Sequence, residues 1–525
     1  MPKCTINGRE VEFKAGQTII EAMNEHGLRI AHYCWHPGLS VAGVCRLCMV
    51  EIEGNPRLQI ACNTQITEGM KINNTSEKVK EAAKWDLDFH LINHPLDCPI
   101  CDQAGECGLQ DQYMEFGKYD PEMAEKKVKK KKVVDLGPTV VLDSERCILC
   151  SRCVRFTEEV SKTNELGIFD RGDRAEIGTF DGKPLDNKYS LNTVDICPVG
   201  ALTSKDFRFR QRVWYLKDAD SICTGCSTGC SVKVYFNKEG FYRVKPRFNA
   251  QVNGYWMCDE GRDIYKFLNR DARLLKAQKR EASGWTELLP GAAAKEASSR
   301  ILAPGARVAV VVTGQYSNEE YEDLFTNLKS KLKNLSVYYW NSSSGQEQEF
   351  DGILLRGDRN PNTRGLQQSL AQHSLGSDWK ELSQKIHKKE LDVLLVVGPE
   401  NLASATDFSE KVDLFSQVPE LIWLQAGKHE KLAQIKSSVL LIPLKTYVEK
   451  DGTYINQAGL AQKIKKVTTV VSEALTLSEA SALLTGQKLL LRSTSDQFVE
   501  SQRQADRVML ENRKKNEFVF RRGTL

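Results

Sequence analysis

Near the start of this 525-residue chain, short apolar segments alternate with polar ones at the spacing of strands and of one helix. Residues 5–11 predict a hairpin with its turn at Asn7-Gly8, a dipeptide that tight two-residue turns favour. Residues 18–26 predict a short helix, opened by a capping box and closed by a glycine. Residues 49–54 alternate as a strand. Residues 1–78 therefore predict a small β-rich domain.

The pattern changes after this first domain and again near residue 273. A helical segment is centred on residues 85–92. In the C-terminal half, apolar runs of strand length alternate with polar helical stretches, which predicts an α/β domain with a buried parallel sheet. These runs are residues 307–313, 391–397, 421–424 and 439–444. The charged stretch at residues 497–522 predicts a helix.

Charge and hydropathy narrow the range of partners. The formal net charge of +4 is small for this length, which argues against nucleic acid or lipid as a partner. No apolar run approaches the roughly 20 residues that cross a bilayer, and no signal pattern opens the chain. The sequence thus predicts contact with a membrane only through partner subunits. Residues 126–132, nearly all lysine, predict a solvated loop, with contact to an acidic partner subunit as the alternative.

The cysteines change this picture most. Fifteen of the sixteen, together with one histidine, fall into four groups in the first half of the chain, and only Cys4 stands outside. In a chain without a signal, CxxC spacing favours metal binding over disulfides. Iron–sulfur clusters are one-electron carriers, so four such groups predict a protein that conducts electrons. In chain order, the four groups are Cys34, Cys45, Cys48 and Cys62; His94, Cys98, Cys101 and Cys107; Cys147, Cys150, Cys153 and Cys197; and Cys223, Cys226, Cys230 and Cys258.

For three of the groups, the spacing alone does not distinguish an iron–sulfur cluster from a zinc ion. The first group has a wider opening gap than plant-type ferredoxins, but its β-rich setting and its distant fourth cysteine favour a [2Fe–2S] cluster. In the second group His94 stands three residues before a CxxC, which favours a cluster with one histidine ligand. His36 and His90 fit no ligand spacing and are predicted to be structural. Iron is favoured in the fourth group by its neighbours, and structural zinc is the alternative in all three.

The third group is the most specific. Two-cluster ferredoxins repeat a CxxCxxCxxxCP run, and the fourth cysteine of each run ligates the other cluster. Cys147, Cys150 and Cys153 match the first run, and Cys197 followed by Pro198 matches the end of the second. The ligands of a second cluster are all replaced, by Thr157, Asn187, Ser190 and Thr193. The pattern predicts a two-cluster ferredoxin fold that holds one [4Fe–4S] cluster.

The order of the groups and two motifs carry a resemblance to a known family. Residues 94–107, HPLDCPICDQAGEC, and residues 195–202, DICPVGAL, resemble the large iron–sulfur subunits of respiratory complex I, the NADH:quinone oxidoreductases. The resemblance extends over residues 1–272. It implies one [2Fe–2S] cluster and three [4Fe–4S] clusters on the sixteen residues named above. The fourth group is similar to an extra cluster of some bacterial members, which implies a place off the direct electron route.

Residues 216–525 more loosely resemble the molybdopterin oxidoreductases. The spacing of the fourth group and the segments 360–365 and 449–456 carry this likeness. About 250 residues follow Cys258, short of a full molybdenum domain, and none is a cysteine that could ligate the metal. The resemblance implies a degenerate domain without molybdenum, kept for packing.

Together these resemblances imply a multidomain chain of α+β and α/β class, truncated at its molybdopterin-like end. The expected domains are a β-grasp [2Fe–2S] ferredoxin domain at 1–78, a one-histidine, three-cysteine [4Fe–4S] domain at 79–120, a ferredoxin-like [4Fe–4S] domain at 139–215, a [4Fe–4S] domain of the molybdopterin-oxidoreductase type at 216–272, and a degenerate molybdopterin-oxidoreductase-like α/β domain at 273–525.

The implied function is electron transfer from a flavin subunit toward quinone, as one subunit of an enzyme. No residues suggest acid–base or nucleophilic catalysis, and no GxGxxG segment suggests a site for NADH. The implied partners are the flavin and NADH-binding subunit, a small [2Fe–2S] subunit, and ferredoxin-like and quinone-site subunits. The implied location is peripheral, on the cytoplasmic side of a bacterial inner membrane.

Other iron–sulfur proteins share parts of this pattern. An NAD-linked formate dehydrogenase subunit predicts eight ferredoxin cysteines and a full molybdenum domain, and an iron-only hydrogenase predicts a downstream cysteine-rich site. This chain has none of these features. The diaphorase subunit of an NAD-reducing hydrogenase is closer but is expected to be much shorter. A zinc-binding scaffold without redox activity is the remaining alternative.

Overall fold

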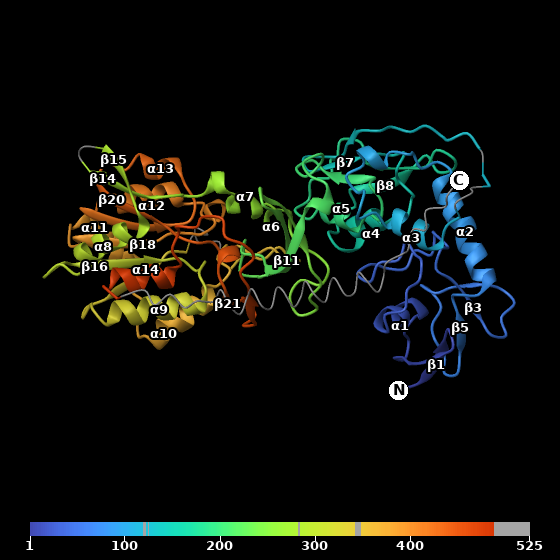
Figure 1. Cartoon of the computed structure of the whole chain (residues 1–525), viewed down its shortest axis with the longest axis horizontal. Coiled ribbons are helices and arrows are strands. Elements are labelled where there is room, and N and C mark those ends of the chain that lie inside the picture. Colours follow the sequence, from blue (N-terminus) through green and yellow to red (C-terminus); the bar gives the residue numbers. More distant parts are fainter. Residues whose placement is uncertain (119–121, 124, 282–283, 342–347, 488–525) are drawn as a thin grey trace, which may run out of the picture.

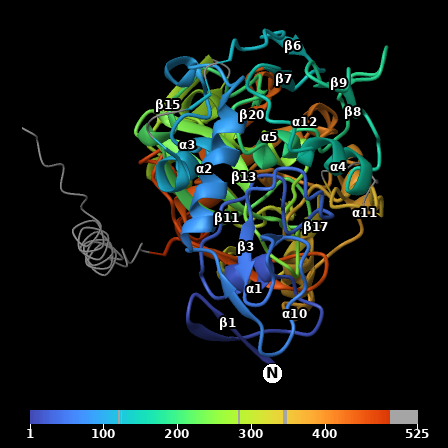
Figure 2. The same ribbon diagram turned by 90° about the vertical axis from the view of Figure 1, so that its right-hand side faces the viewer.

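The computed structural model describes residues 1–118, 122–123, 125–281, 284–341 and 348–487. Its domains form an elongated molecule, with the α/β domain at one end and the N-terminal domain at the other (Figure 1). Figure 2 looks along the molecule from the N-terminal end, with α1, α2 and β3 nearest the viewer. The helix predicted at residues 497–522 lies outside the described residues.

The N-terminal domain has the β-grasp arrangement. Its sheet has the order β2-β1-β5-β3-β4, and β1 pairs parallel with β5. The predicted hairpin is confirmed, because Asn7 and Gly8 form its turn with φ of 53° and 77°. The predicted helix is α1, opened by a capping box between Thr18 and Glu21. The elements are β1 (Lys3–Ile6), β2 (Arg9–Glu12), α1 (Ile19–Glu25), β3 (Met49–Ile52), β4 (Gln59–Ile60) and β5 (Lys71–Asn73).

The middle of the chain consists of short elements joined by long loops. The helix α2 covers the helical segment predicted at residues 85–92 and begins earlier. The helix α4 packs against the hairpin β8-β9, and the helix α5 contacts the sheet of order β10-β7-β6. The elements are α2 (Glu77–Leu91), η1 (Cys98–Ile100), α3 (Gly108–Phe116), β6 (Val134–Asp135), β7 (Val140–Leu142), α4 (Arg152–Glu159), β8 (Leu166–Phe169), β9 (Glu176–Thr179), α5 (Asn192–Ile196), β10 (Leu202–Ser204) and η2 (Val213–Tyr215).

A three-stranded antiparallel meander follows, in the order β11-β12-β13, and two short helices connect it to the C-terminal domain. The elements are β11 (Lys217–Ile222), β12 (Ser231–Asn237), β13 (Gly240–Pro246), α6 (Asp259–Arg262), α7 (Tyr265–Leu268) and η3 (Arg270–Ala272).

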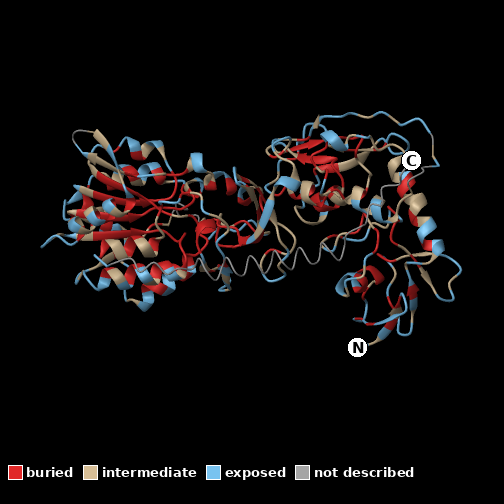
Figure 3. Cartoon of the chain, viewed as in Figure 1, coloured by how far each residue is buried: buried red, intermediate tan, exposed pale blue. Residues whose placement is uncertain are grey.

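The C-terminal domain contains the parallel sheet that the apolar runs predict. Its order is β15-β14-β20-β19-β18-β16-β17, and the five strands from β20 to β17 are parallel. The antiparallel hairpin β14-β15, which the apolar pattern did not predict, extends the edge at β20. Figure 3 shows these parallel strands as the largest buried region of the molecule. The strands are β14 (Ala277–Glu281), β15 (Gly284–Leu288), β16 (Val308–Val312), β17 (Ser336–Tyr339), β18 (Val393–Val397), β19 (Glu420–Gln425), β20 (Ser438–Pro443), β21 (Gly452–Ile455) and β22 (Ala461–Ile464).

Helices cover both faces of this sheet. One apolar cluster includes residues of α8, α9, α10 and α14, and the cluster on the other face includes residues of α11, α12 and α13. Among the described residues, no helix combines the length and the apolar composition that a bilayer crossing needs. The helices are α8 (Pro290–Ile301), α9 (Asn318–Lys329), α10 (Thr363–Gln372), α11 (Trp379–His387), η4 (Leu402–Ser404), α12 (Phe408–Phe415), α13 (Glu430–Ala433), η5 (Tyr447–Glu449) and α14 (Leu477–Leu484).

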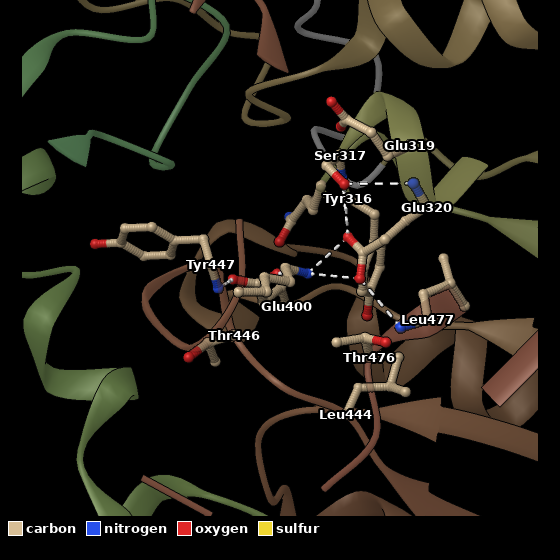
Figure 4. A network of polar contacts seen from close by, with 12 residues as sticks. Tyr316, Ser317, Glu319, Glu320, Glu400, Leu444, Thr446, Tyr447, Thr476 and Leu477 are labelled. Atoms are coloured by element: carbon tan, nitrogen blue, oxygen red, sulfur yellow. Dashed lines mark hydrogen bonds and ion pairs between the residues drawn. The ribbon is translucent and has the colours of Figure 1, made fainter. Parts of the chain in front are cut away.

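A buried ionic network lies beside the carboxyl ends of β16 and β18 (Figure 4). Lys450 is 3% exposed and contacts Glu320 at 2.8 Å and Glu400 at 3.1 Å. The Leu477 and Tyr447 amides donate to these same carboxylates. Two acidic side chains thus share one buried lysine, and the network joins α9 to the loops after β18 and β20.

Candidate iron–sulfur centres

The first group lies in the loop after α1 and beside β3, and all four of its cysteines are buried. The Cys34 and Cys45 thiols interact with each other, and so do those of Cys48 and Cys62. Contact with Cys45 lowers the pKa of Cys34 to about 5, and contact with Cys48 lowers the pKa of Cys62. Two pairs of thiols fit a [2Fe–2S] cluster, in which two thiolates hold each iron.

The second group lines a cavity of about 410 Å³. Cys101 and Cys107 are buried, and Cys98 is exposed at its rim. The His94 Nδ1 atom is buried and has no hydrogen-bond partner. Burial lowers the pKa of His94 to about 4, so the imidazole is in the neutral form that binds metals. These features fit a cluster with one histidine ligand.

The third group also lines one cavity, where α4 and α5 approach β7 and β10. Burial raises the pKa of Cys147 to about 12 and that of Cys150 to about 11. Deprotonated thiolates at this site therefore need the positive charge of a bound metal. The residues in place of a second cluster form ordinary hydrogen bonds instead: Thr157 donates to Val154, and Thr193 donates to Ser190.

The fourth group lines a cavity of about 240 Å³ that reaches the C-terminal domain. All four of its cysteines are buried, and burial raises the pKa of Cys223 to about 12. The amide of Gly225 donates to the Cys223 sulfur, and the amide of Gly261 donates to the Cys258 sulfur. Such bonds to the sulfurs are typical of cluster sites.

Among the described residues, no three histidine, cysteine, aspartate or glutamate side chains converge closely enough to hold a single metal ion. The second, third and fourth groups instead surround cavities. The structure thus brings all sixteen predicted residues to four places in the fold. The remaining cysteine, Cys4, is buried on β1 in the N-terminal core.

The groups differ in the core to which they belong. One apolar cluster contains Cys34 and Cys45, Cys107, and Cys150 and Cys153, which come from the first, second and third groups. A separate apolar cluster contains all four cysteines of the fourth group. The segment of the third group adjoins that of the second, because the Gly108 amide donates to the Pro198 carbonyl. One core therefore contains cysteines of the first three sites but none of the fourth, while Cys48 and Cys62 of the first site pack in the N-terminal core.

The roles of two residues around these sites were not expected from the sequence. Lys127, within the lysine-rich run, donates to the carbonyls of Leu91, Ile92 and His94 at 2.9 Å each. These hydrogen bonds fix the loop that carries His94, so the lysine-rich run at residues 126–132 is not only a solvated loop. Gly200 leaves room for the second group, because a Cβ there would overlap the Cys101 sulfur. Neither residue has a ligand-like spacing that could have identified it.

The segments that resemble the molybdopterin oxidoreductases pack against each other and against the fourth group. The Ile455 amide donates to Asn362 at 2.7 Å, which joins the two segments. Asn456 donates to the Thr228 carbonyl in the loop of the fourth group. Glu449 forms a fully buried ion pair with Arg273 at 2.7 Å. In this chain these residues serve packing and hydrogen bonding.

Comparisons with known proteins match successive segments of the chain. Five family models match: a 2Fe-2S iron-sulfur cluster binding domain at 3–77, the NADH-ubiquinone oxidoreductase-G iron-sulfur binding region at 87–121, the ferredoxin-like domain of NADH-quinone oxidoreductase subunit 3 at 137–203, a molybdopterin oxidoreductase Fe4S4 domain at 216–270, and molybdopterin oxidoreductase at 253–476. Together with the fold and the four cysteine-rich sites, these matches define the class: an iron–sulfur protein in which ferredoxin-type domains precede a molybdopterin-oxidoreductase-like domain.

Similarity over most of the chain identifies the family. The G-type subunit of NADH-quinone oxidoreductase from Rickettsia conorii is 30% identical over 493 residues, which cover 89% of this chain and 69% of that protein. The NADH-ubiquinone oxidoreductase 75 kDa subunit of Reclinomonas americana is 32% identical over 481 residues, 86% of this chain and 67% of that protein. The chain belongs to the family of G-type subunits of NADH-quinone oxidoreductase, and the resemblance seen in its sequence is confirmed.

Other matches are partial. The G-type subunit of NADH-quinone oxidoreductase from Streptomyces coelicolor is 37% identical over 321 residues, which cover 60% of this chain and 38% of that protein. A crystal structure of NAD+-reducing [NiFe]-hydrogenase in the H2-reduced state is 28% identical and covers 40% of this chain and 91% of that chain, with a TM-score of 0.37. That low score gives no support to the hydrogenase alternative.

A histidine ligand should be detectable through the potential of its cluster. His94→Cys replaces a neutral ligand with an anionic one, so we expect the second cluster to keep its iron and to have a lower midpoint potential. Redox titration followed by EPR measures the change. His90→Ala is the matched control, because His90 donates to the Asp86 carbonyl and should leave the spectrum unchanged. An unchanged spectrum in His94→Ala would show that His94 is not a ligand.

Proposed function

We propose that this chain carries electrons from a flavin-bearing, NADH-oxidising subunit toward quinone. Each bound cluster supplies one-electron transfer. The proposed ligands are the cysteines and histidine of the four groups, with one [2Fe–2S] cluster on the first and one [4Fe–4S] cluster on each of the others. The observation that carries the proposal is the gathering of all sixteen residues at four sites, with cysteines from three of these sites in one core.

The same packing supports a division of roles. Cysteines of the first three groups share a core, and we assign these groups to the direct route. The fourth group packs with Tyr447 and Tyr454 of the C-terminal domain, and we assign it a place off that route. The Arg155 guanidinium, which donates to the carbonyls of Cys34 and Cys150, fixes the first group against the third. Fixed separations favour electron transfer, since the cluster positions need no rearrangement.

The five-domain division given above is part of the proposal, and the C-terminal domain within it is assigned a structural role. In an open parallel sheet, ligands bind at the switch point of strand order, which here lies between β16 and β18. Side chains of the chain itself form hydrogen bonds there, beside the cavity of the fourth group. Tyr316 donates to the Gly398 carbonyl, and Gln315 bonds to both Asn401 and Ser404. The residues after Cys258 include no cysteine that could ligate the metal, which supports a domain without a molybdenum cofactor.

We assign the partners and the location from family membership. The chain works with other subunits of NADH-quinone oxidoreductase. Among these we propose a flavin and NADH-binding subunit, a small [2Fe–2S] subunit, and ferredoxin-like and quinone-site subunits. The proposed location is the cytoplasmic side of a bacterial inner membrane, held there by these partners.

Metal analysis tests the cluster assignment directly. Protein purified without oxygen should contain about fourteen irons per chain, the number that one [2Fe–2S] and three [4Fe–4S] clusters require, and an equal amount of acid-labile sulfide. Dithionite reduction should produce EPR signals of both cluster types. Molybdenum and tungsten should be substoichiometric. A colourless protein rich in zinc would refute the proposal, and stoichiometric molybdenum would revive the dehydrogenase alternative.

A further inference from the structure

Arg152 occupies an unusual place among the cluster sites. It begins α4, between two cysteines of the third group, and its side chain lines the cavity of that group. One terminal guanidinium nitrogen donates to the Ile196 carbonyl at 3.1 Å, and the other donates to the Trp35 carbonyl at 2.5 Å. Ile196 precedes Cys197 of the third group, and Trp35 follows Cys34 of the first. One guanidinium therefore binds the loops of both sites.

In the described part of the chain, the charge of this guanidinium has no carboxylate partner. No aspartate or glutamate there forms an ion pair with Arg152. Its Nε atom is buried and has no hydrogen-bond acceptor. Burial lowers the pKa of Arg152, but the cysteines that face it, Cys150 and Cys197 of the third group and Cys34 and Cys45 of the first, favour its charged form. An arginine stays charged under these conditions.

Arg146 provides a contrast within the same part of the fold. It also lies close to a cluster site, but it contacts Asp97 at 3.1 Å and Asp143 at 3.2 Å. Its charge is therefore balanced by the protein. A partly buried cation without such partners is costly unless another anion compensates it. The groups placed to compensate Arg152 are the thiolate-ligated clusters of the first and third sites.

We propose that Arg152 is a positioning residue that holds the first and third clusters at a fixed separation and raises the reduction potentials of both. This inference rests on the proposed electron-transfer function. A positive charge stabilises the reduced state of a cluster, because reduction adds negative charge. One side chain thus links the potentials of two carriers on the proposed route.

The test compares Arg152→Gln with Arg152→Lys in the assembled complex, by redox titration followed by EPR. The Gln variant removes the charge, and we expect the midpoint potentials of the first and third clusters to fall together. The Lys variant keeps the charge, and we expect a clearly smaller fall. The fourth cluster, which lies in another core, is the internal reference and should not change. Arg307→Gln, which removes an exposed arginine of the C-terminal domain that pairs with Asp392, is the control and should leave the first and third potentials as they are.

Iron content and potentials separate the possible outcomes. Wild-type protein without clusters would contradict the proposed function itself. Intact clusters with unchanged first and third potentials in Arg152→Gln would overturn the inference alone, and so would an equal shift in the Lys and Gln variants. If the Gln variant loses the third cluster, the potential of its first cluster still tests the inference, because the first site should lose the same stabilising charge. An unchanged potential of the first cluster would then overturn the inference.

Discussion

Replacing Cys150 with alanine is expected to abolish electron transfer from NADH to quinone in the assembled complex. Cys150 is buried, lines the cavity of the third group, and belongs to the core that contains cysteines of the first three groups. Without its thiolate the third site lacks one of four ligands, and the route through this chain is interrupted. Reduction of ferricyanide by NADH should be spared, since the flavin can reduce it without this route. Steady-state assays with the two acceptors measure both effects.

The matched variant is Cys226→Ala in the fourth group. Cys226 is equally buried, but it packs in the separate core beside the C-terminal domain. Loss of this cluster is expected to weaken assembly, because metal binding contributes folding energy. Complex that does assemble should retain most of its turnover with quinone. Turnover lost in assembled complex that lacks only the fourth cluster would contradict the off-route assignment, and normal quinone reduction by Cys150→Ala would contradict the route itself.

Replacing Lys450 with methionine is expected to destabilise the C-terminal domain by about 3–5 kcal/mol, the cost of breaking a buried ion pair. Burial alone would lower the pKa of Lys450, but Glu320 and Glu400 outweigh it and raise that pKa. The variant leaves these two carboxylates buried and without their shared cation (Figure 4). Hydrogen exchange of the amides in β16 and β18 measures the local free energy of opening.

Lys445→Met is the control for this experiment. Lys445 contacts Glu479 at 3.2 Å, but both side chains are partly exposed, so its removal should cost only about 0–1 kcal/mol. The two variants remove the same charge from neighbouring positions of one domain. Equal protection of β16 and β18 in both would show that the buried network does not stabilise the sheet.

Local features of this chain could be predicted with success. The Asn7-Gly8 turn, the capped helix α1 and the parallel strands β16 and β18 all depend on neighbouring residues or on short apolar runs. The hairpin β14-β15 was missed, because its strands are mostly half-buried or exposed and lack a clear apolar alternation. It forms where β14 pairs with the edge of β20, a contact between residues far apart in the sequence.

The roles of individual charged residues were decided by tertiary contacts. The lysine-rich run suggested a solvated loop, but Lys127 reaches back across more than thirty positions to the His94 loop. The segment at 449–456 showed only a likeness to the molybdopterin oxidoreductases, and the structure adds that Glu449 and Lys450 form buried ion pairs with Arg273, Glu320 and Glu400. Neither outcome could be predicted from spacing, because each partner is distant in the sequence.

The sequence by itself determined the family and which side chains are available as ligands, because the loop that wraps a cluster must present its cysteines at short, fixed intervals. Only the tertiary structure decided how the sites are related. It places cysteines of the first three groups in one core and those of the fourth in another, and it sets Arg152 against the Trp35 carbonyl, 117 positions away. Such relations depend on the packing of whole domains, which burial of apolar surface drives and which local spacing does not encode.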